Sequence, residues 1–255
     1  MTQQDIEASE APLIEHLIEL RTRLIYCVVG FFAAFAVSFY FSSDILHLLV
    51  QPFKWGTGQD VSLISIKLLG VFLVKIKIAF FGGLFIGFPL IATQIYRFVA
   101  PGLYKHEKQA FMPYLIATPV FFLLGAALVY FFLLPVAIHF FTALAGTSGV
   151  TLMPDIEAYL DFVMMLLLAF GLCFQLPVVL TLLGQIGIVS YAQLKSGRKF
   201  AIVGVFIVAA VLTPPDPISQ VAMAVPLMAL YELSVQAVRF IEARRRKRDA
   251  AEQAV

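Results

Sequence analysis

The sequence predicts an all-α, polytopic integral membrane protein with six transmembrane helices and both termini in the cytoplasm. Of its 255 residues, 61% are hydrophobic and only 13% are charged, whereas soluble domains have about 45–50% apolar and about 25% charged residues. The apolar residues fall in long runs without charge, and the mean hydropathy is +0.92. Basic residues gather between alternate runs. This composition excludes a soluble globular enzyme, a disordered chain and a disulfide-stabilised chain.

The first two spans are expected at residues 24–43 and 78–96. These stretches contain 20 and 19 uncharged residues, bounded by Arg23 and Asp44 and by Lys77 and Arg97. At 1.5 Å per residue, such a helix matches the roughly 30 Å hydrocarbon core of a bilayer. We expect no cleavable signal peptide, because the leading tail is acid-rich and the first apolar run is long enough to remain as an anchor.

The next uncharged run covers residues 109–154 and is too long for one crossing. No turn residues occur in its middle, and a turn signal comes only at residues 146–149. We therefore expect one long, tilted helix from about residue 113 to 138, followed by a loop that folds back onto the membrane surface. The fourth span is expected at residues 162–183, with a kink at Pro177.

The last two apolar runs, residues 200–215 and 217–231, are short. Each reaches about 24 Å as a helix, below the ~30 Å core. The proline-rich segment 213–217 is a rigid turn that no helix continues through. The second of these spans could lengthen to about residue 238 if Glu232 lies near the surface. We expect the bilayer to be thinner beside this hairpin than elsewhere.

Six spans leave an asymmetric distribution of positive charge. Fourteen of the 18 lysines and arginines fall on one side, and the other four are Lys54, Lys67, Lys75 and Lys77. The side with excess positive charge is the cytoplasmic one. We expect a single membrane domain over residues 1–255. It comprises a cytoplasmic amphipathic N-terminus at residues 1–23, a six-span core at 24–238 and a basic cytoplasmic tail at 239–255, with affinity for anionic lipid.

The sequence carries no motif for nucleophilic, metal-dependent or nucleotide-dependent catalysis. We expect no enzymatic activity, no metal, no cofactor and no nucleic-acid partner. Cys27 and Cys173 lie within apolar runs, which favours a packing role. Gln175 is the only strongly polar side chain expected deep in the membrane, where a lone Gln most often bonds a neighbouring helix.

Two acidic segments belong to the cytoplasmic side. Residues 12–24 have leucines at helical spacing, with Glu15 and Glu19 four residues apart on the opposite face and Arg23 four beyond. Residues 100–107 join a Pro-Gly turn to Tyr104 and Glu107 among basic neighbours. Carboxylates on one face form a potential site for a cation.

Three segments resemble the signature segments of the TatC family, the multispanning core subunit of the twin-arginine (Sec-independent) protein translocase. They are His-Leu-Ile-Glu-Leu-Arg at residues 16–21, Phe-Val-Ala-Pro-Gly-Leu-Tyr-Lys-His-Glu at 98–107 and Leu-Thr-Pro-Pro-Asp at 212–216. The resemblance extends in order over about residues 13–240. It implies a receptor for twin-arginine signal peptides in the bacterial inner membrane, which exports folded proteins and is driven by the protonmotive force. It also implies TatA and TatB as single-span partners and a homo-oligomer within the complex.

The resemblance also implies site residues. Glu19, Glu107, Arg21 and Phe98 match the patch of the family that binds signal peptides, and Pro101 and Tyr104 belong to the same motif. Pro52 and Asp216 match other functional positions, for which the sequence alone indicates a loop turn and a helix N-cap. Many relatives carry Glu where this chain has Gln175, so we expect a hydrogen bond to a partner span there rather than proton relay.

Three other functions remain as alternatives. A secondary transporter is disfavoured, because inverted repeats and charges within the spans are missing. An intramembrane enzyme is disfavoured, because no nucleophile–base pair lies within the spans. A purely structural assembly protein differs from a receptor only in its failure to capture a paired-arginine peptide.

Overall fold

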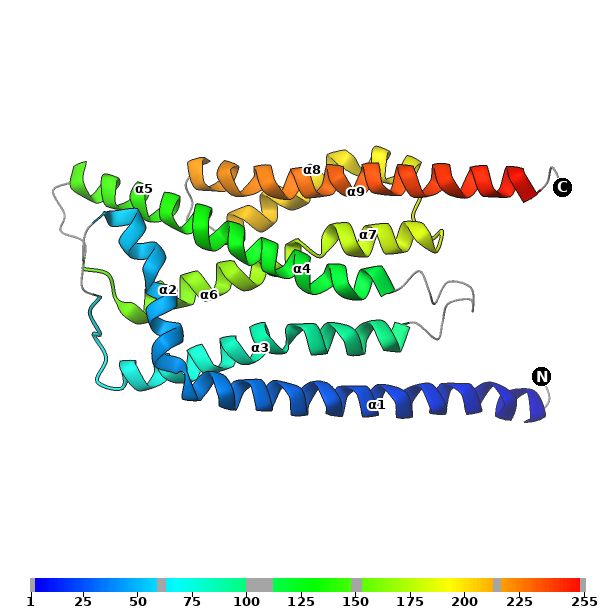
Figure 1. Ribbon diagram of the computed structural model, residues 1–255, viewed down its shortest axis with the longest axis horizontal. Helices are drawn as coiled ribbons and strands as arrows, with labels where there is room; N and C mark the ends of the chain where they lie inside the picture. Colours follow the sequence, from blue (N-terminus) through cyan, green and yellow to red (C-terminus); the bar gives the residue numbers. More distant parts are fainter. Residues whose placement is uncertain (1–2, 59–62, 100–111, 148–152, 213–216, 253–255) are drawn as a thin grey trace. The chain divides into compact units, whose positions relative to one another are not determined.

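A computed structural model describes residues 3–58, 63–99, 112–147, 153–212 and 217–252 (Figure 1). The described chain is helical, and its one β-bridge joins Ile64 to Asp155. The helices in order are α1 (Gln3–Tyr40), α2 (Ser42–Thr57), α3 (Gly70–Val99), α4 (Met112–Leu128), α5 (Leu134–Thr147), α6 (Ile156–Cys173), α7 (Leu176–Gln185), α8 (Tyr191–Leu212) and α9 (Pro217–Glu252). The expectation of an all-α membrane protein is confirmed.

Five helical stretches of the described chain are long and apolar enough to cross a membrane: His16–Tyr40, Gly70–Phe98, Pro113–Thr147, Ile156–Gln185 and Gln220–Arg246. They correspond to the expected spans one to four and six. The fifth expected span lies in α8, which carries Lys195, Arg198 and Lys199 in its first half. The count of six crossings therefore stays a prediction.

The chain divides into two compact units, Met1–Ile45 with Lys75–Leu115 and Leu46–Val74 with Ile116–Val255. In the first unit α1 lies beside residues 75–99 of α3 (Figure 1). The two helices approach closely at Gly83, where a Cβ atom would lie 2.9 Å from the ring of Phe31. Small residues allow helices in membranes to approach in this way, which gains packing contacts that lipid cannot replace.

Helix α1 runs without a break through the boundary expected at residue 23. The amphipathic segment at residues 12–24 and the first apolar run therefore lie in one helix of 38 residues, rather than in two separate elements. This continuity follows from the sequence, because no glycine or proline separates the two segments.

The expected outer loop after the first span contains a helix, α2, that the sequence analysis missed. Asp44 lies in its first turn and Lys54 in its last, which suits the helix dipole. Pro52 is inside α2 and buried, so its interpretation as a loop turn is wrong. A proline cannot bond the carbonyl four residues before it. Here the Tyr130 hydroxyl donates to that carbonyl, of Leu48, at 2.8 Å.

The third apolar run forms one continuous helical stretch, as expected, but it extends to Thr147. The loop expected after residue 138 is therefore wrong. A π-helical turn at Val129–Leu133 joins α4 to α5, with the Leu134 amide donating to the Val129 carbonyl. This turn ends two residues before Pro135, whose missing amide would interrupt a regular helix.

The expected break near Pro177 is confirmed. Helix α6 ends at Cys173 and α7 begins at Leu176, with Gln175 at the junction. Asp155 caps the start of α6 by accepting a hydrogen bond from the Ala158 amide. Helix α9 is longer than expected, because helix-forming residues continue it to Glu252, well past its apolar part.

Helices α7, α8 and α9 pack together around the buried side chains of Leu194, Val235 and Val238. Arg198 of α8 donates to Glu232 of α9 at 2.6 Å. Arg198 lies just before the apolar part of α8, which begins at Phe200. Charges paired in this way are tolerated near a membrane surface.

Candidate functional site

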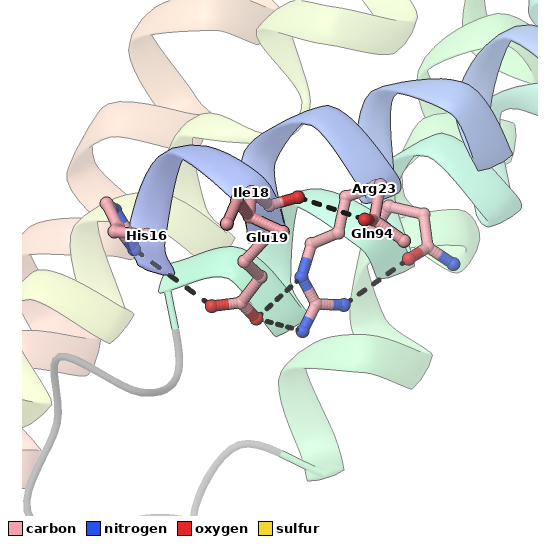
Figure 2. A network of polar contacts seen from close by, with 6 residues as sticks. His16, Ile18, Glu19, Arg23 and Gln94 are labelled. Carbon is pink, nitrogen blue, oxygen red and sulfur yellow. Dashed lines mark hydrogen bonds and ion pairs between the residues drawn. The ribbon is translucent and has the colours of Figure 1, made fainter. Parts of the chain in front are cut away.

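The polar network of the first unit lies between α1 and the end of α3 (Figure 2). Arg23 donates to Glu19 through Nε, at 2.9 Å from Oε1, and Nη2 bonds the same oxygen. The Nη1 group of Arg23 lies 3.4 Å from Oε1 of Gln94 on α3. Glu19 and Arg23 are four residues apart and therefore share one face of α1.

His16 joins this network to Phe98. Its Nδ1 atom lies 4.0 Å from Oε2 of Glu19. Its ring stacks on that of Phe98, with the centroids 4.3 Å apart and the planes at 20°. Phe98 and Gln94 are one turn apart on α3, so both reach the same face of α1. The structure thus brings together two of the site residues that the sequence indicated, Glu19 and Phe98.

The Glu19–Arg23 ion pair is only partly exposed to solvent. The side chains of Arg23 and Glu19 are 22% and 30% exposed. The Arg23 guanidinium directs two N–H donors at the Glu19 carboxylate.

Arg21 does not join this network. It is exposed, and within the described residues it forms no hydrogen bond or ion pair. Two residues correspond to about 200° around a helix, so Arg21 lies on a different side of α1 from Glu19. Of the other site residues, Pro101, Tyr104, Glu107 and Asp216 lie outside the described residues.

Gln175 contacts α4 within the second unit. Its Nε2 donates to the Thr118 carbonyl at 3.0 Å and lies 3.4 Å from the Gly171 carbonyl. Its amide oxygen is buried and accepts no hydrogen bond in the described part of the chain. Donation to carbonyl oxygens requires an amide N–H, which an ionised Glu lacks. Both carbonyls belong to this chain, in α4 and α6, so the bond expected towards a partner span stays a prediction.

Sequence reasoning did not reveal three features of the structure. The spacing of Arg23 from Glu19 was visible, but nothing in it showed that the pair is partly buried. Gln94 is 71 residues from Arg23, and only the fold brings them together. Tyr130 carries no motif that would reveal its bond to the Leu48 carbonyl. Across the described residues, no three His, Cys, Asp or Glu side chains gather where they could hold a metal ion.

Known proteins resemble this chain over most of its length. A family model for the Sec-independent protein translocase protein (TatC) matches residues 15–226. The Sec-independent protein translocase protein TatC of Magnetococcus marinus is 43% identical over 250 residues, covering 98% of this chain and 92% of the relative. That of Escherichia coli (strain K12) is 39% identical over 240 residues, covering 93% and 92%.

Two solved structures also resemble this chain. A crystal structure described as the twin arginine translocase receptor TatC has a TM-score of 0.79 and 37% identity, covering 89% of this chain and 99% of that one. A second crystal structure of TatC, in the detergent DDM, has a TM-score of 0.78 and 38% identity. Together with the apolar helices described above, these likenesses make the chain a multi-pass membrane protein and a translocase subunit. It belongs to the TatC family of Sec-independent protein translocase proteins.

Proposed function

We propose that this chain is the receptor that binds twin-arginine signal peptides at the cytoplasmic face and nucleates the complex that exports folded proteins. The observation that carries the proposal is the Glu19 carboxylate, which already accepts a guanidinium through two N–H donors beside the stacked rings of His16 and Phe98. Such a site suits an arginine side chain, because a guanidinium presents paired donors and stacks on aromatic faces.

Glu107 is proposed as the second acid of the site, and Arg21, Pro101 and Tyr104 as further members, because they match the family's motifs. A second carboxylate would give each arginine of a pair its own acceptor, and Glu19 supplies one of the two. A peptide carrying paired arginines and a photoreactive group should be captured near Glu19 and Glu107, and charge reversal of either Glu should abolish the capture. Equal capture of a paired-lysine peptide by the wild type and both variants would exclude a receptor role.

The proposed orientation has six spans, with both termini in the cytoplasm of a bacterium and the core in its inner membrane. Fourteen of 18 basic residues then lie on the cytoplasmic side. Export is proposed to be driven by the protonmotive force, as the resemblance to the family implies.

Side-specific labelling tests this orientation. Gly146→Cys and Lys195→Cys, each in a background with Cys27 and Cys173 replaced by Ala, should react with an impermeant maleimide from opposite faces of the membrane. Gly146 suits a probe, because a Cβ there would have no atom within 4 Å. Reaction of both positions from the same face would contradict the six-span orientation.

The proposed partners are TatA and TatB, within a complex that contains more than one copy of this chain. Gln175 is partly exposed in this chain and is proposed to contact a partner span while its Nε2 remains bonded to α4. Polar side chains of this kind join helices in membranes, each contributing about 0.6–2 kcal/mol.

Replacement of Gln175 by Leu should lower the amount of TatA and TatB that co-purifies with this chain by about threefold or more. The reason is that Leu matches the volume but can neither donate nor accept. Gln220→Leu is the matched control, since Gln220 also donates to a helix carbonyl, that of Phe206, at 3.2 Å. Unchanged assembly and export in Gln175→Leu would show that the proposed role is wrong.

A further inference from the structure

The Glu19 carboxylate is occupied by an arginine of its own chain. We propose that Arg23 is a built-in competitor for Glu19, and that this competition makes the site select arginine over lysine. The inference rests on the proposed function, since it concerns how the same carboxylate discriminates between incoming cations. It follows from the hydrogen bonds of four residues in the first unit: His16, Glu19, Arg23 and Gln94 (Figure 2).

The first step concerns the two carboxylate oxygens. Both the Nε and Nη2 donors of Arg23 bond Oε1. The other oxygen, Oε2, lies 4.0 Å from His16 Nδ1, beyond hydrogen-bond distance. Among the described residues, one carboxylate oxygen therefore accepts both donors of Arg23 and the other accepts no hydrogen bond.

The second step concerns what each cation can do with one oxygen. A lysine ammonium carries its three donors on one nitrogen, so it cannot place two parallel N–H bonds on the two carboxylate oxygens, and the positive charge of Arg23 beside it weakens the attraction. An arginine presents two parallel donors that fit both oxygens of a carboxylate, so it gains a second bond when Arg23 gives up Oε1. Competition with Arg23 thus penalises lysine more than arginine.

The third step is the fate of Arg23 after displacement. Its Nη1 group already contacts Gln94 on α3 at 3.4 Å, so the guanidinium keeps an acceptor when Glu19 is withdrawn. With only 22% of its side chain exposed, Arg23 depends on such an acceptor. Gln94 therefore lowers the cost of opening the site without contacting the incoming peptide.

The test compares Arg23→Gln with wild type in peptide binding by the full-length protein in detergent. The probes are one peptide sequence with paired arginines, paired lysines or paired glutamines. The matched control is Arg97→Gln, which removes an exposed arginine at the end of α3 in the same unit. It measures the general effect of losing one positive charge. Arg23→Lys keeps the positive charge but lacks the paired N–H donors of a guanidinium. Its ratio of paired-arginine to paired-lysine affinity is expected to lie between those of wild type and Arg23→Gln.

We expect both cationic peptides to bind Arg23→Gln more tightly than Arg97→Gln, with the greater gain for paired lysines. The ratio of paired-arginine to paired-lysine affinity should fall about fivefold, as removal of a partly exposed ion pair implies. An unchanged or larger ratio in Arg23→Gln would overturn the competitor role, even if wild type binds the paired-arginine peptide well.

A readout without peptide separates this inference from the proposed function. Amidation of Glu19 by a water-soluble carbodiimide, mapped by mass spectrometry, should increase several-fold in Arg23→Gln and not in Arg97→Gln. If wild type binds paired arginines no better than paired glutamines, the receptor proposal fails and the labelling alone decides whether Arg23 occupies Glu19. Equal labelling in both variants would overturn that occupancy.

Discussion

Export of a folded reporter with a twin-arginine signal peptide is expected to fall about a hundredfold when Glu19 is replaced by Lys. The substitution removes the acceptor of a charge-assisted hydrogen bond and sets an ammonium beside Arg23, the present partner of Glu19. The loss of such bonds costs about 1.5–3 kcal/mol, and each 1.36 kcal/mol is a factor of ten. The measurement is the amount of processed reporter outside the cytoplasm per unit of protein in the membrane.

Two further variants make this result specific. Glu19→Gln keeps the shape and one acceptor, so its export should lie between those of wild type and Glu19→Lys. Asp44→Lys reverses an exposed acid in the first turn of α2, outside the network, and should retain most of the export. If Glu19→Lys, present at wild-type levels in the membrane, exported at least half as much as wild type, Glu19 would not be part of the peptide site.

Substitution of Gly125 by Ala is expected to give the largest loss of stability among conservative changes to the apolar core. A Cβ at this position would lie 2.6 Å from the carbonyl oxygen of Phe170 and 2.8 Å from Cγ of Phe174. The first of these atoms belongs to the backbone of α6, so α4 and α6 would have to separate. Overpacking of this kind costs about 1–3 kcal/mol.

The check is thermal unfolding of the purified protein in detergent, in which Gly125→Ala should unfold about 5 °C below wild type. Gly204→Ala on α8 is the control, because a Cβ there would meet no atom within 4 Å. Since Ala favours helix over Gly by about 1 kcal/mol, that variant should be as stable as wild type or more stable. Equal unfolding temperatures for the two variants would contradict the close packing of α4 on α6.

The long apolar runs could be located from the sequence, because the thickness of a bilayer sets the length of an uncharged helix. The lack of turn residues near Gly125 made one continuous helix predictable there, and the structure has an uninterrupted helical stretch at Pro113–Thr147. Where the chain leaves the apolar runs, this constraint no longer applies. Helix α2 and the long end of α9 were missed for that reason, since charged residues there were interpreted as loop or tail.

In the candidate site too, the local spacing of residues was predictable from the sequence and the contacts between helices were not. The spacing of Glu19 and Arg23 makes their pairing on one helical face predictable. The contact of Arg23 with Gln94 and the stacking of His16 on Phe98 depend on the alignment of α1 with α3, which no local pattern specifies. The motif at residues 98–107 indicated Glu107 through its resemblance to a family, and that residue lies outside the described ranges.

The most direct test of the central claim is the structure of the full-length protein with a paired-arginine peptide bound. We expect one guanidinium of the peptide about 3 Å from the carboxylate of Glu19, with the Arg23 guanidinium withdrawn from Glu19 and still bonded to Gln94. The second guanidinium should lie against Glu107. A peptide bound elsewhere, with the Glu19–Arg23 pair intact, would contradict the account.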